Sequence, residues 1–186
     1  MAGLVEMIIN NPAIIKSIAK QVGIDASSAE SIISKLAPIL MGGAKSNLQS
    51  DKDSGRLIRK IESDNYAEIF DKPEEAVKKD DFTTMGNDIL AELTGSKENS
   101  REVAKQVEEE TGVSSSIIKS LLPMLAPMII GALSKTSAAS STVHNMETGT
   151  SSTSSMTDML TNLIDQDHDG SMIDDVMGMA AKFIFH

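Results

Sequence analysis

GVSSSIIKSLLPMLAPMIIGALSK, residues 112–135, contains the longest nearly uncharged apolar run of the chain. The run itself, 120–133, is shorter than the ~20 residues that a membrane-spanning helix needs, and two prolines lie inside it. Its apolar residues suit the face of a packed helix, and Ser114 just before it can cap that helix. The stretch therefore predicts a long helix in the core of an all-α protein.

The same pattern occurs earlier in the chain. Residues 23–44 (GIDASSAESIISKLAPILMGGA) align without gaps to 112–133, and seven of the 22 aligned positions are identical. Most other pairs exchange one apolar residue for another, and Asp25 lies opposite Ser114. We interpret this as an internal duplication, in which two similar helical units form one bundle and the two Leu-Ala-Pro helices pack together. Two copies are too few for a self-supporting solenoid.

Capping residues mark the first helices of the bundle. Asn11 can cap a helix whose first residue is Pro12, because the missing N–H of a proline costs nothing at that position. Gly23 suits the end of this helix, since glycine readily adopts the left-handed conformation found there. Asp25 can then cap the next helix. The sequence thus predicts two consecutive helices joined by a short turn.

The end of the second helix and the stretch after it are less regular. Pro38 removes a backbone donor and is expected to bend or interrupt the helix, and MGG at 41–43 is expected to be its C-terminal stop. The apolar spacing within the charged stretch 45–100 predicts two or three amphipathic helices with solvated polar faces. Gly95 is expected to end the last of these helices.

The composition limits the classes of function. The chain has four Phe, one Tyr and no Trp, and its formal net charge is −10. Bases would therefore find few aromatic platforms and a phosphate backbone would be repelled, so nucleic-acid binding is not expected. The absence of cysteine excludes disulfides and thiol chemistry. Because no motif for phosphate binding, serine hydrolysis or zinc proteolysis occurs, we expect no enzyme.

Three parts of the chain differ in composition. Residues 1–135 are expected to form the helical domain, and 136–157, with 13 Ser or Thr in 22 residues, to form a linker. Residues 158–186 are expected to form a helix–loop–helix tail. From 137 onward there are seven acidic residues and one Lys, a net charge of −6. The N-terminal residues lack a basic leader and a long apolar segment, so a cytoplasmic protein is expected.

The tail contains the acidic run DQDHDGSMIDD, residues 165–175. Asp165, Asp167 and Asp169 occupy positions 1, 3 and 5 of an EF-hand-like loop, followed by a glycine at the sharp-turn position 6. Ser171 can offer its carbonyl at position 7. A hard cation bound by these oxygens would remove the repulsion between the carboxylates, so the run predicts a calcium site.

The last ligand of the loop is ambiguous. An EF-hand supplies a bidentate Glu at position 12, which here is Val176. Deleting one residue after the glycine would bring Asp175 into register, so a shortened loop is expected, with Asp174 the other candidate. Both aspartates also suit the first turn of the following helix, where acidic residues favour the helix dipole. His168, at position 4, is expected to be exposed rather than a ligand.

Residues 86–135 resemble a bacterial domain family known as domain of unknown function 937. The resemblance rests on an Ile-Leu-x-x-x-x-Gly segment, a Gly-Val-Ser helix start and a Leu-Pro-x-Leu-Ala-Pro-x-x-x-Gly-Ala-Leu helix. These are Ile89, Leu90 and Gly95; Gly112, Val113 and Ser114; and Leu122, Pro123, Leu125, Ala126, Pro127, Gly131, Ala132 and Leu133. The tail 165–180 is similar to the acidic ends of family members. The resemblance implies a bacterial, all-helical protein and no particular activity.

We therefore expect a non-enzymatic calcium-binding protein that self-associates, as a homo-oligomer, or docks a protein partner through apolar helices. The alternative is a membrane-surface or envelope-associated protein, in which 121–133 or the tail helix GMAAKFIF lies at a bilayer. Few basic residues accompany these apolar segments, although anionic lipid would attract them. Membrane contact is therefore the second expectation.

Overall fold

The computed structural model describes residues 3–49, 54–144, 157–158, 160–161 and 164. Within this part of the chain the secondary structure is entirely helical, as the sequence predicts. The helices are α1 (Leu4–Ile9), α2 (Pro12–Val22), α3 (Ala26–Leu48), α4 (Ser54–Ile61), α5 (Asp64–Asp71), α6 (Pro73–Ala76), α7 (Phe82–Thr94), α8 (Lys97–Thr111) and α9 (Ser115–His144).

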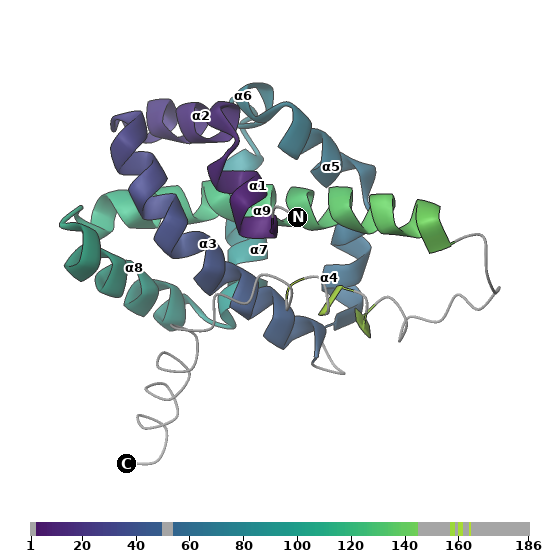
Figure 1. Cartoon of the computed structure of the whole chain (residues 1–186). Helices are drawn as coiled ribbons and strands as arrows, with labels where there is room; N and C mark the ends of the chain where they lie inside the picture. Colours follow the sequence, from purple (N-terminus) through teal and green to yellow (C-terminus); the bar gives the residue numbers. More distant parts are fainter. Residues whose placement is uncertain (1–2, 50–53, 145–156, 159, 162–163, 165–186) are drawn as a thin grey trace, which may run out of the picture.

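Helix α9 runs through the middle of the domain, with the other helices on both sides of it (Figure 1). Every residue from 121 to 134 is buried, as expected for a helix that is apolar around its whole circumference. Helices α1, α2, α3, α4, α5, α7 and α8 all pack against it. The prediction of a core helix at 112–135 is confirmed.

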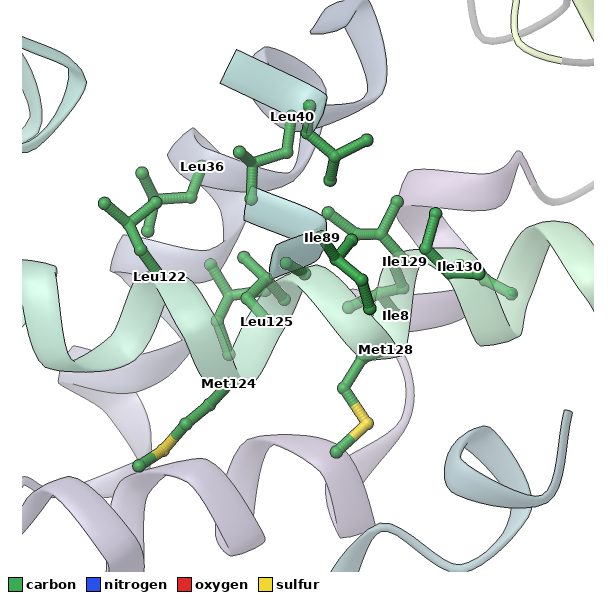
Figure 2. Packing of buried hydrophobic residues seen from close by; sticks show 14 of the residues in the cluster. Ile8, Leu36, Leu40, Ile89, Leu122, Met124, Leu125, Met128, Ile129 and Ile130 are labelled. Atoms are coloured by element: carbon green, nitrogen blue, oxygen red, sulfur yellow. The ribbon is translucent and has the colours of Figure 1, made fainter. Parts of the chain in front are cut away.

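The core around α9 is built mainly from aliphatic side chains and methionine. Figure 2 shows Leu36 and Leu40 of α3 and Ile89 of α7 grouped with Leu125 of α9. Met128, also of α9, is fully buried. Methionine is unbranched and fills irregular gaps between helices, which suits a protein with few aromatic residues. Roughly 1.5–3 kcal/mol of transfer free energy accompanies burial of each such side chain.

The predicted helix starts at Pro12 and after Asp25 are both confirmed. The Asn11 side chain accepts hydrogen bonds from the N–H groups of Ala13 (3.1 Å) and Ile14 (3.3 Å). Asp25 Oδ1 accepts from the N–H of Ser28 at 2.9 Å. Each cap satisfies backbone donors that have no partner within their own helix.

The predicted end of α3 is wrong. The helix neither stops at 41–43 nor is interrupted at Pro38, but continues to Leu48. A proline removes only one hydrogen bond from the ladder, and α3 keeps burying apolar residues beyond it. Gly43 serves close packing instead: a Cβ built there would collide with the carbonyl oxygen of Leu93 in α7. A side chain at this position would therefore push α3 and α7 apart.

A second glycine sets the crossing of α7 and α9. A Cβ at Gly86 would collide with the carbonyl oxygen of Pro123. Within its own helix this carbonyl would bond to the N–H four residues later, but that residue is Pro127, which has none. The bare glycine backbone thus lies against a carbonyl group that the proline has freed.

The charged middle of the chain forms four helices, α4 to α7, where the sequence predicts two or three. The additional element is α6, a single turn that starts at Pro73. The predicted stop at Gly95 is confirmed, since α7 ends there with a φ of +74°. Short helices of this length show too little periodicity to be counted reliably from sequence.

Helix α9 extends to His144, nine residues into the stretch that the composition assigns to a linker. Ser137 is buried, and the Thr136 hydroxyl donates to the carbonyl of Ala132 at 2.8 Å. Back-bonding of this kind satisfies Ser and Thr hydroxyls within a helix. The helical body is therefore longer than the composition suggests, and the rest of that stretch, 145–156, lies outside the described residues.

Candidate functional site

The predicted calcium ligands lie outside the residues that the structure describes. They are Asp165, Asp167, Asp169, Ser171, Asp174 and Asp175. His168 lies outside them as well. In the described part of the chain, no three His, Asp or Glu residues are grouped so that they could hold a metal ion. The acidic run thus remains a candidate on the strength of its sequence pattern.

The structure does describe residues that lead into the acidic run. Residues 157, 158, 160, 161 and 164 have helical backbone. Leu160 is 1% exposed and Ile164 is 8% exposed, and both belong to the main hydrophobic core. Asp165, the first predicted ligand, follows Ile164 directly. The residue that precedes the acidic run is therefore anchored to the helical body, which could not be foreseen when 158–186 was interpreted as a separate unit.

A shallow surface cleft of about 440 Å³, largely open to solvent, lies where α4, α5 and α7 meet. Helix α4 directs Leu57, Ile58 and Ile61 into the core, so its basic residues remain on the opposite face. The residues that line the cleft are Arg56, Arg59, Lys60, Ser63, Asn65, Tyr66 and Glu92. Three cations and one carboxylate give this lining a formal charge of +2, whereas the chain as a whole is negative.

An ion pair holds one side of the cleft together. Lys60 Nζ lies 2.7 Å from Glu92 Oε1, and both side chains are largely shielded from solvent. The Asn47 amide also donates to the backbone carbonyl of Glu92 at 3.1 Å. These contacts join α3, α4 and α7 at one point. Since Lys60 is engaged by Glu92, the cationic groups left for a ligand are those of the two arginines.

Arg56 and Arg59 are exposed, and no ion pair within the described part of the chain involves either of them. Their guanidinium groups present planar sets of donors that match carboxylate or phosphate oxygens. Tyr66 lines the same cleft. Burial, and then the negative charges of Glu92 and Asp88, raise the pKa of the Tyr66 hydroxyl. The phenol therefore stays protonated and able to donate.

This cleft was not predicted from the sequence, because the mixed charges of the stretch 45–100 are typical of solvated helix faces. The available signal was SGRLIRKI, residues 54–61, in which three basic residues alternate with three apolar residues and no acid intervenes. That pattern predicts a basic helix face. It gives no indication that Glu92 and Tyr66 lie beside that face, because those contacts bring together separate helices.

One helix of the described chain is long and apolar enough to cross a membrane, namely Ser115–Ser137 within α9. The structure buries 78% of its most apolar window among the other helices. A core helix passes the same test of length and composition. In this fold its apolar surface is used in packing the domain.

These features define an all-helical domain organised around one buried helix that contains two prolines. The sequence profile of a bacterial family of unknown function, DUF937, matches residues 6–136. The chain belongs to this family, which confirms the resemblance drawn from the Leu-Ala-Pro helix. No curated protein and no solved structure matches the chain.

Proposed function

We propose that this chain is a non-enzymatic calcium-binding interaction protein, in which a rigid helical body carries an ion-dependent acidic loop. The observation that supports the proposal is the position of the acidic run, which begins one residue after Ile164, a side chain buried in the core. An anchored entry lowers the entropy that the loop must lose when a cation orders it. Calcium would thus bind a loop that is already fixed at one end.

The expected ligand set is the one that the pattern defines: Asp165, Asp167 and Asp169, the carbonyl of Ser171, and either Asp175 or Asp174. Asp is shorter than the Glu that closes an EF-hand, so binding is weaker than in a tight buffer site. A dissociation constant on the order of 10⁻⁵–10⁻³ M is expected. Such a site responds to changes in calcium instead of holding it permanently.

The duplication remains part of the proposal. Eight buried positions of α3 correspond, at a constant offset of 89, to eight buried positions of α9. The first set is Ala29, Ile32, Ile33, Leu36, Ala37, Leu40, Met41 and Ala44, and the second is Ile118, Leu121, Leu122, Leu125, Ala126, Ile129, Ile130 and Leu133. Gly23 and Gly112 precede the two helices with similar φ values of +80° and +71°. Two helical units with one ancestral sequence account for this agreement.

Both Leu-Ala-Pro helices bury their apolar faces inside the domain, so we expect the helix that the sequence predicts after the calcium loop to bind the partner. The segment 172–179, which leads into this helix, contains Met172, Met177 and Met179, and methionine-rich surfaces adapt to different partners. Calcium would order this helix and offer it to a protein partner or to a second copy of the chain.

Calorimetric titration of the full chain with calcium, followed by light scattering with and without calcium, tests the proposal. We expect one binding event, and a change in mass or hydrodynamic radius on binding. Asp167→Asn should abolish the heat, whereas Asp80→Asn, which removes an exposed charge of the body, should leave it unchanged. The absence of a binding heat in the wild-type chain would refute calcium binding, and recovery on floating liposomes would favour the membrane alternative.

A further inference from the structure

We propose that the cleft between α4, α5 and α7 is the docking site of the chain's own acidic run, 165–175, when no cation is bound to that run. Calcium and the cleft would then compete for the same carboxylates, so calcium binding would release the tail from the body. The release step rests on the proposed function, whereas docking of the tail in the absence of calcium does not.

The charges of the two partners are complementary. The lining of the cleft has a formal charge of +2, and Arg56 and Arg59 form no ion pair with described residues. The acidic run carries five aspartates and no basic residue other than His168. Guanidinium groups bind carboxylates through paired, charge-assisted hydrogen bonds. Two arginines carry the same charge of +2 as a calcium ion, so they can also relieve part of the repulsion between the aspartates.

The anchored segment places the run within reach of the cleft. Eleven extended residues span up to about 36–40 Å, and a compact domain of about 140 residues has a radius of gyration of roughly 14 Å. Starting from Ile164, whose side chain is buried in the body, the run can therefore reach over roughly the nearer half of the domain surface. The tether gives it an effective concentration on the order of millimolar, so weak contacts are enough for docking.

Competition follows from the coordination chemistry of the carboxylates. A calcium ion takes six to eight oxygen ligands at about 2.3–2.6 Å, which draws the aspartates together around one point. Arginines on a helix surface instead need the carboxylates spread along that surface. Since Asp165, Asp167 and Asp169 cannot adopt both arrangements at once, each state excludes the other, as a two-state switch requires.

Paramagnetic relaxation enhancement on the full chain tests the docking. The protein lacks cysteine, so Met177→Cys provides a single position for a nitroxide label, two residues beyond the acidic run. In chelator at low salt, the amide signals of Arg56, Arg59 and Asn65 should broaden more than those of α2. The substitution R56S/R59S should reduce this difference at least threefold, because it removes both guanidinium groups of the cleft.

The matched control is K16S/K20S, which removes two exposed cations from α2 and should leave the broadening at the cleft unchanged. Equal broadening over the whole surface, or loss of the effect in both variants, would overturn the docking. Docking within one chain would also be overturned if broadening arose only between a nitroxide-labelled molecule and a separate isotope-labelled molecule, because a second copy of the chain would then occupy the cleft. Broadening that persists in saturating calcium would overturn the release step, and calorimetry on the same sample shows separately whether calcium binds.

Discussion

Individual glycines determine how closely the helices of this domain approach one another. The clearest case is Gly86, whose backbone lies against the carbonyl oxygen of Pro123. Gly86→Ala should destabilise the protein by about 3 kcal/mol or more, because a new methyl group meets backbone atoms that cannot move aside. The measurement is the free energy of unfolding in urea.

Gly55→Ala is the control for this prediction. Gly55 lies in α4, and no heavy atom within 4 Å would meet a Cβ at that position. The substitution should leave stability unchanged or raise it by roughly 0.5–1 kcal/mol, since alanine favours a helix more than glycine does. Equal effects at both positions would show that close packing at Gly86 is not what limits stability.

Asp25 links the start of α3 to pH. The Ser28 hydroxyl, which donates to the Asp25 carboxylate at 2.6 Å, and then the Ser28 backbone N–H hold the pKa of Asp25 below its ordinary value. A depressed pKa means that the cap contributes stability above the unfolded pKa and loses it as the pH falls below about 4. The amide shift of Ser28 should follow this titration. In Asp25→Asn, which keeps an acceptor but cannot ionise, the corresponding step should disappear.

Single residues also show where sequence reasoning succeeded and where it failed. Asn11, Asp25 and Gly95 act on their own helix ends, so their roles could be predicted from local chemistry. Gly43 could not be interpreted in this way, because its role is to accommodate the carbonyl of Leu93, fifty residues away in sequence. In the sequence, a glycine that ends a helix cannot be distinguished from a glycine that lets two helices cross at close distance.

Among the helices, the location of α9 could be predicted best from the sequence, and the surroundings of α4 could be predicted least. A helix that is apolar on all sides has one stable location, the centre of a domain. The polar face of α4 has no such constraint, and the cleft beside it is completed by Glu92 of α7 and Tyr66 of α5. The candidate cleft therefore arises from long-range contacts, whereas the candidate calcium loop is contained in eleven consecutive residues.

The short helical segment before the acidic run provides a test at the level of an element. Leu160 is 1% exposed, so Leu160→Ala should cost about 2–4 kcal/mol of unfolding free energy through lost contacts and a residual cavity. Asp158→Ala, which truncates an exposed side chain of the same segment, should change stability by less than about 0.5 kcal/mol. If Leu160→Ala has no effect, the segment does not pack on the body in solution, and the anchor of the loop is lost.

For the molecule as a whole, composition and periodicity predicted the all-helical class and the apolar, methionine-containing core. They could not predict how the other described helices pack around α9, since many arrangements bury similar apolar surface. The distribution of charge is the other global feature. Six of the ten net negative charges lie after residue 136, while the cleft on the body is locally positive. Residues 1–136 carry the other four negative charges, so the expected attraction between the tail and the body is confined to the cleft.

A calcium titration of the isotope-labelled full chain, followed by its amide chemical shifts, provides the test of the whole account. If the loop binds calcium beside an anchored segment, the signals of 165–175 and of Leu160 and Ile164 shift together along one single-site binding curve. The signals of α9, in the centre of the body, stay in place. If no signal of the acidic run moves in ~10 mM calcium, well above the expected dissociation constant, the protein has no calcium site there and the proposed function is contradicted.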